Sequence, residues 1–87
     1  MERRATFVRN LDGWHGDARL YRLSAPLEGN SHVVVSAVVV PITGPETYIF
    51  GADSNGDVDN YLELDGSFRG ALDHRRALAG AGYEVEM

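Results

Sequence analysis

The chain has 87 residues, which is room for one hydrophobic core, so residues 1–87 are expected to form a single domain. It contains no cysteine, which excludes disulfides, thiolate nucleophiles and thiolate metal ligands. A net charge of −5 argues against nonspecific binding to nucleic acid, because such binding needs clustered cations.

Three segments in the first half of the chain have the composition of strands. Residues 5–9 and 17–23 contain β-branched, aromatic and leucine side chains, and Pro26 is expected to end the second of them. Residues 32–40 include six valines and are apolar on both faces. Such a run is typical of a central strand that is covered on each side. We expect a helix to cover one side and a second subunit to cover the other.

Further strands are predicted after this valine-rich segment. Pro41 should terminate it, and residues 46–51 then return antiparallel. Asn55-Gly56 is a strong hairpin signal, because a type I′ turn needs two positive φ angles. Residues 58–64 are predicted to form the strand that follows this turn.

A helix is predicted near the C-terminus, with Asp65 or Ser67 as its N-cap. One apolar stripe at helical spacing contains Phe68, Ala71, Leu72, Leu78 and Ala79. If Gly82 adopts the left-handed conformation at the end of the helix, Tyr83 should pack back on it. Residues 83–87 alternate and could form a short edge strand.

These elements predict an α+β fold, in which an antiparallel sheet of four or five strands carries one C-terminal helix packed on one face. The valine-rich strand should be central. The longest apolar run is too short to cross a bilayer, and no signal peptide follows Arg3-Arg4. The sequence therefore predicts a cytoplasmic protein with no membrane contact.

The candidate binding residues are Trp14 and His15, in a glycine-rich turn, together with the nearby Tyr21 and Arg22. Loops carry binding residues disproportionately, and tryptophan is enriched at interaction hot spots. The competing interpretation is that Trp14 closes one end of the core. We assign no catalytic residue, metal ligand or cofactor. Asp73-His74 is a poor dyad, because neighbours on a helix diverge by roughly 100°.

Five acidic residues lie between Asp53 and Asp65. Their spacing begins like a calcium loop, but Val58 and Leu64 stand where that loop needs glycine and glutamate. A solvated turn is the favoured interpretation. A weaker alternative is an acidic surface that mimics nucleic acid.

Several segments resemble a group of small uncharacterised proteins of actinobacteria and their phages. The resemblance rests on residues 16–23, 33–37, 46–50, 63–67, 72–74 and 82–83. It spans most of the chain and implies no activity or site residues.

The leading functional hypothesis is a non-enzymatic accessory module that binds another protein or associates with itself, most simply as a homodimer. The first alternative is a small ligand-binding domain or enzyme with a pocket near Trp14 and His15. The second alternative is an acidic mimic that inhibits a nucleic-acid-binding protein of the host or phage.

Overall fold

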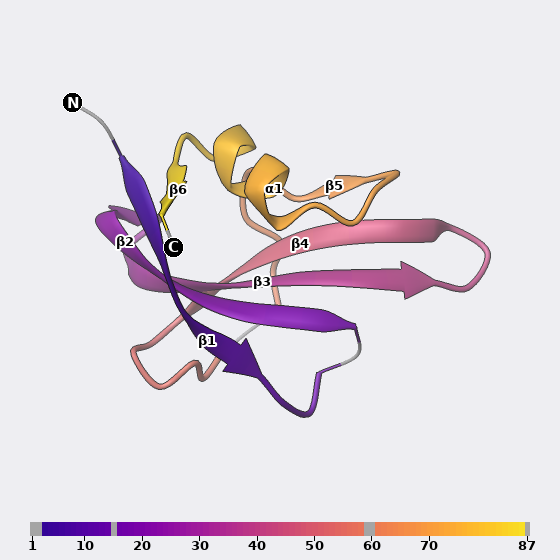
Figure 1. Cartoon of the computed structure of the whole chain (residues 1–87), viewed down its shortest axis with the longest axis horizontal. Helices are drawn as coiled ribbons and strands as arrows, with labels where there is room; N and C mark the ends of the chain where they lie inside the picture. The colour runs from indigo at the N-terminus through magenta and orange to yellow at the C-terminus, as the bar shows by residue number, and fades with distance from the viewer. Residues whose placement is uncertain (1–2, 15, 59–60, 87) are drawn as a thin grey trace.

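The computed structural model describes residues 3–14, 16–58 and 61–86, which form a twisted sheet with one short helix against it (Figure 1). The elements in chain order are β1 (Arg4–Leu11), β2 (Asp17–Leu27), β3 (Asn30–Val40), β4 (Gly44–Ala52), β5 (Phe68–Arg69), α1 (His74–Gly80) and β6 (Glu84–Glu86). The strand order across the sheet is β5-β4-β3-β2-β1-β6. The predicted combination of a sheet with one C-terminal helix is confirmed, and β3 is central as expected.

The sheet differs from the prediction in strand number and direction. It has six strands instead of four or five, and it is mixed, because β6 pairs parallel to β1 with Ala5 opposite Val85. The strand that the sequence did not indicate is β5, which has two residues and therefore carries little periodicity. The three residues of β6 lie within the edge strand expected over residues 83–87.

The four long strands extend beyond their predicted ends. β2 continues through Pro26, which was expected to terminate it. The β2–β3 register is irregular between Arg22 and Leu27, so Pro26 lies where no regular ladder bond is needed. A two-residue turn follows, with positive φ at both Glu28 and Gly29, as a type I′ hairpin requires.

The strand predicted over residues 58–64 is wrong for the residues described there. Asn55-Gly56 does form a turn, in which the Gly56 N–H donates to the Asp53 carbonyl at 3.0 Å. No strand follows it among residues 58 and 61–64. In this segment the Leu64 N–H donates to the Ile49 carbonyl at 2.8 Å, which ties the segment to β4.

The helix begins later than predicted. Its N-cap is Asp73, whose carboxylate accepts a hydrogen bond from the Arg76 N–H at 3.0 Å. Ser67 instead accepts from the Ile49 N–H at 2.9 Å, which ties the chain to β4. Gly70 has a φ of 113°, which an α-helix cannot accommodate, so the predicted apolar stripe is divided among β5, the connection that contains Ala71 and Leu72, and α1.

The predicted end of the helix is confirmed. Gly82 has a φ of 96°, and the Tyr83 N–H donates to the Leu78 carbonyl at 2.9 Å. This is the six-to-one bond of a Schellman motif. The chain then enters β6 at Glu84, as the alternating pattern indicated.

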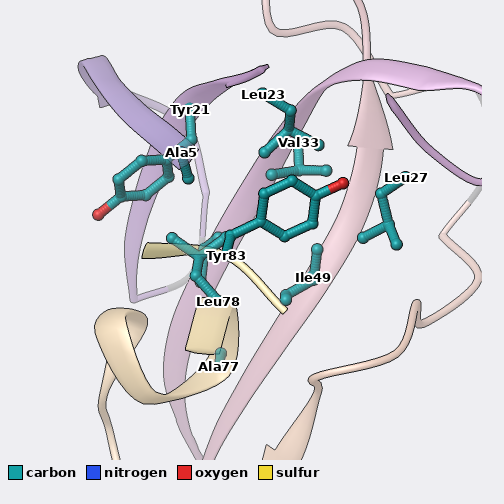
Figure 2. Packing of buried hydrophobic residues seen from close by; sticks show 10 residues of the cluster. Ala5, Tyr21, Leu23, Leu27, Val33, Ile49, Ala77, Leu78 and Tyr83 are labelled. Carbon is teal, nitrogen blue, oxygen red and sulfur yellow. The ribbon is translucent and has the colours of Figure 1, made fainter. Parts of the chain in front are cut away.

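Buried side chains form two clusters on opposite sides of the sheet. We call the side that carries α1 the helix face; its cluster is drawn in Figure 2 and comprises Ala5, Tyr21, Leu23, Leu27, Val33, Val35, Ile49, Ala77, Leu78 and Tyr83. We call the other side the Trp14 face; its buried residues are Ala18, Leu20, Val34 and Ala52, with Trp14 packed against them. Val34 is fully buried there by the chain itself, so the cover expected from a second subunit is not needed at the centre of β3.

Candidate functional site

Trp14 lies in the turn between β1 and β2 and packs against the buried residues of the Trp14 face. Gly13 and Gly16 both have positive φ, at 85° and 81°. Gly16 also lies tight against β3, since a Cβ there would come within 2.9 Å of the Val38 Cα atom. Only glycine meets both demands, and it holds the turn against the sheet.

Four aromatic rings form one cluster that includes Trp14, and we call Trp14, Tyr48, Phe50 and Tyr61 the aromatic surface. Trp14 lies 5.9 Å from Phe50 and 5.7 Å from Tyr61, measured between ring centroids. Phe50 is also 5.5 Å from Tyr61, edge to face, and stacks on Tyr48 at 5.9 Å. Phe50 is buried, whereas Tyr61 remains 66% exposed. The cluster is therefore held in the sheet through Phe50, and Tyr61 exposes its ring to solvent.

The exposed ring reaches this position through the turn after β4. The Asp53 carboxylate accepts hydrogen bonds from the N–H groups of Asn55, at 2.9 Å, and Asp57, at 3.0 Å. Arg9 of β1 donates to the Asn55 carbonyl, and Gly56 packs close to Leu11. The turn is therefore held against β1, and Tyr61 lies against Trp14 and Phe50 on the Trp14 face.

A hollow of about 350 Å³ lies at the end of β4, where Gly51, Ala52 and Leu64 are among its lining residues. Three carboxylates line it, from Glu28, Asp53 and Asp57, and no basic side chain is among its lining residues. Leu62, which follows Tyr61, forms part of the wall and is 70% exposed. The hollow can accept a cationic group next to an apolar one.

The predicted binding residues are not all brought together. Trp14 packs against the Trp14 face, while Tyr21 is buried in the cluster of the helix face. Arg22 is exposed on β2, opposite His32 of β3. His15 lies outside the described residues. Trp14 therefore shares its surroundings with Tyr61 and Phe50 rather than with Tyr21.

Sequence reasoning missed Tyr61 and Phe50 as neighbours of Trp14. Phe50 was expected as one residue of a strand, and Tyr61 as part of another. The only signal in the sequence was the count of aromatic residues near the Asn55-Gly56 turn, which says nothing about the face on which each ring lies.

Tyr21 lines a separate hollow of about 290 Å³ on the helix face, together with Phe7, Asn10 and Arg19. Arg19 is held by Asp17, with 2.9 Å between guanidinium nitrogen and carboxylate oxygen. The cation in this hollow is thereby neutralised, which reduces its attraction for an anionic ligand.

His74 opens α1 and is 8% exposed. Its Nε2 atom lies 2.8 Å from the Asp17 carbonyl oxygen. Burial lowers the pKa of His74 below its ordinary value of 6.5, although the hydrogen bond to Asp17 opposes this change. Asp73 caps the helix through Arg76 and is not hydrogen-bonded to the His74 ring. Asp73 and His74 therefore do not form a hydrogen-bonded acid–base dyad, an arrangement that the sequence analysis disfavoured.

Two of the five acidic residues between Asp53 and Asp65 make contacts within the fold. Glu63 lies 4.0 Å from the Arg69 guanidinium, and Asp53 holds its own turn. Asp59, which belongs to the predicted cluster, is outside the described residues. Within residues 3–14, 16–58 and 61–86, no three histidine, cysteine, aspartate or glutamate side chains gather as a metal site would require.

No helix in the described part of the chain is long and apolar enough to cross a membrane. Comparison with known proteins shows no matching family model, no matching curated protein and no matching solved structure.

Proposed function

We propose that the chain is a non-enzymatic protein-binding module and that the aromatic surface is where its partner docks. The observation that carries this proposal is the exposure of Tyr61 beside rings that are anchored in the sheet. Contiguous apolar groups that remain exposed often mark interaction sites.

The arrangement of the rings favours a tight contact. Trp14 and Phe50 are held by the sheet, so they lose little freedom when a partner binds. Tryptophan and tyrosine supply large contact areas with few rotatable bonds, which is why they dominate binding hot spots. The edge-to-face contact between Tyr61 and Phe50 fixes the orientation of the exposed Tyr61 ring.

The hollow at the end of β4, whose wall includes Leu62, the residue after Tyr61, indicates the chemistry of the partner. Its carboxylates, from Glu28, Asp53 and Asp57, face no basic side chain within the hollow. An arginine or lysine of a partner would supply that charge, and its aliphatic stem would lie along Leu62. We therefore expect a partner segment with a basic residue next to an apolar or aromatic one.

The two alternatives receive less support. A ligand pocket around Trp14 and Tyr21 would need both residues on one side of the sheet, and they lie on opposite faces. A mimic of nucleic acid would need its carboxylates free, whereas Glu63 contacts Arg69. A cytoplasmic location and the likeness to small actinobacterial and phage proteins remain part of the proposal.

The test uses Trp14, the only tryptophan of the chain, as the reporter. A displayed library of random peptides is selected against the full chain, and binding of the selected peptides is measured by tryptophan fluorescence. We expect sequences that combine arginine or lysine with an apolar residue. Their affinity should fall about tenfold or more in Tyr61→Ala and in the double variant Glu28→Gln/Asp57→Asn, which leaves the turn-holding Asp53 in place.

A matched control is Leu72→Ala, because Leu72 is also exposed but lies just before α1. This variant should bind as the unmodified chain does. Peptides that bind Tyr61→Ala with unchanged affinity, or a library that yields no binder, would contradict the proposal.

A further inference from the structure

The turn after β4 contains Asn55 followed by Gly56. Asn55 is exposed, and its side-chain amide makes no hydrogen bond within residues 3–14, 16–58 and 61–86. The backbone nitrogen of the residue after an asparagine can attack the side-chain amide, and a glycine leaves that nitrogen unhindered because it has no Cβ. Asn55 is the only asparagine of the chain that a glycine follows. The sequence and the exposure of this turn therefore favour deamidation.

The other described asparagines are less open to this reaction. Asn10 lies within β1 and is followed by Leu11. Asn30 is followed by Ser31, and its side-chain amide donates to the Leu27 carbonyl at 3.1 Å. A side chain on the following residue crowds the attacking nitrogen, and hydrogen bonds hold the reacting groups apart. These two asparagines are internal references for Asn55.

The reaction at Asn55 has two steps. When the turn opens, the Gly56 N–H leaves the Asp53 carbonyl, to which it donates at 3.0 Å. The Gly56 nitrogen then attacks the Asn55 side-chain carbonyl carbon and gives its proton to water, and the amide nitrogen leaves as ammonia. Water opens the resulting succinimide ring at one of its two carbonyls. Opening at the side-chain carbonyl gives aspartate, whereas opening at the backbone carbonyl gives isoaspartate and turns that carbonyl into a carboxylate.

Arg9 reaches this turn because β1 is irregular just before it. The register between β1 and β2 shifts between Phe7 and Arg9, and such a bulge re-aims the side chains that follow it. Asn10 accordingly lines the hollow of the helix face together with Phe7. Arg9 instead donates to the Asn55 backbone carbonyl, and its Nη2 atom lies 3.7 Å from the position that a Cβ of Gly56 would occupy. The guanidinium therefore lies against the peptide bond between Asn55 and Gly56.

The oxygen that Arg9 contacts gains charge in only one of the two ring openings. Water that adds to the Asn55 backbone carbonyl places negative charge on this oxygen, and the isoaspartate product keeps that charge as a carboxylate. A guanidinium that already donates to the oxygen stabilises both states, because hydrogen bonds to charged groups are the stronger ones. The side-chain carbonyl has no such donor within the described residues. The contact therefore favours isoaspartate over aspartate.

We propose that Asn55 is a site of spontaneous deamidation and that Arg9 directs the product to isoaspartate. The product carries an additional negative charge, which pairs with Arg9. Its main chain is longer by one carbon, so the two bonds that the Asp53 carboxylate accepts from this turn should be disturbed. This inference does not depend on the function proposed for the aromatic surface, because the reaction needs no partner.

Incubation of the full chain in neutral buffer tests the proposal. Samples are digested at intervals, and mass spectrometry with electron-transfer fragmentation distinguishes isoaspartate from aspartate at each asparagine position. We expect Asn55 to be lost about tenfold or more faster than Asn10 and Asn30. The ratio of isoaspartate to aspartate should fall about threefold or more in Arg9→Gln. It should fall similarly when the unmodified chain is incubated in urea, which removes the contact without a substitution.

Arg22→Gln is the matched control, because Arg22 is also exposed but lies on β2, opposite His32. Its ratio of the two products should equal that of the unmodified chain. Loss of Asn10 or Asn30 as fast as that of Asn55 overturns the proposed site. A product ratio that is the same in the folded unmodified chain, in Arg9→Gln and in urea overturns the role of Arg9.

Discussion

The two faces of the sheet are closed in different ways. The helix face has ten buried residues in its cluster and is covered by α1, which is capped by Asp73 at its start and by a Schellman motif at its end. The Trp14 face has four buried residues and is covered by turns and by the chain around Tyr61. The helix face therefore supplies most of the stability, while the Trp14 face leaves side chains available for contact.

The largest expected effect is on the helix face. Leu78 is completely buried, so Leu78→Ala should lower the free energy of unfolding by about 3 kcal/mol. A chain of this length has roughly 4–13 kcal/mol in total, so much of its stability would be lost. Denaturant titration followed by circular dichroism measures the loss. Leu72→Ala, at a half-exposed leucine, should cost less than about 1 kcal/mol. Equal losses in the two variants would contradict the comparison.

The helix face was largely predictable, because it depends on local signals. The alternation of β3 placed Val33 and Val35 on one side, and the glycine at 82 indicated how the helix ends and why Tyr83 turns back on Leu78. Even so, the helix start was misplaced. Ser67 and Asp73 are both good caps, and only the tertiary bond from Ile49 to Ser67 determines which of them is used.

The Trp14 face was not predictable to the same extent. Its cover consists of contacts between residues far apart in the chain, such as Trp14 with Tyr61 and Arg9 with Asn55. Nothing in the periodicity of either segment indicates that they meet. The sequence showed correctly that β3 is apolar on both sides, but it could not show that the same chain covers the second side.

The turn beneath the Trp14 face gives the next largest effect. A Cβ at Gly16 would lie 2.3 Å from the Ala37 carbonyl oxygen, which is backbone and cannot move aside. Gly13 has a similar positive φ, but nothing lies within 4 Å of its Cβ position. We expect Gly16→Ala to cost about 2 kcal/mol or more and Gly13→Ala about 1 kcal/mol, measured by thermal unfolding. Similar losses in both would mean that the turn is not pressed against β3.

The N-cap of α1 has a smaller effect. Asp73→Ala removes the acceptor for the Arg76 N–H and should cost about 1 kcal/mol of unfolding free energy. Asp65→Ala is the matched control, since Asp65 was the other predicted cap and is exposed. Its substitution should leave the midpoint of denaturation unchanged. A larger loss from Asp65→Ala than from Asp73→Ala would mean that the helix begins near Asp65, as the sequence indicated.

The stability of the helix face should also depend on pH. Burial lowers the pKa of His74 in the folded chain below 6.5, so the unfolded chain binds this proton more readily. The stabilisation is complete above pH 6.5 and declines as the pH falls through that value towards the folded pKa. The melting temperature of the unmodified chain should therefore drop more between pH 7 and pH 5 than that of His74→Gln. The other two histidines are present in both proteins, so parallel profiles would exclude this role for His74.

The smallest effect on stability is expected at Tyr61, the exposed ring of the aromatic surface. Tyr61 is 66% exposed, so Tyr61→Ala should cost less than about 1 kcal/mol, as measured by denaturant titration. Phe50→Ala, which removes a buried ring of the same cluster, should cost about 3 kcal/mol. If the two losses were equal, Tyr61 would be a structural cover for Val34 and Phe50. A small loss combined with weakened peptide binding would assign Tyr61 to the contact with a partner, because an exposed ring that contributes little to folding is free to serve another molecule.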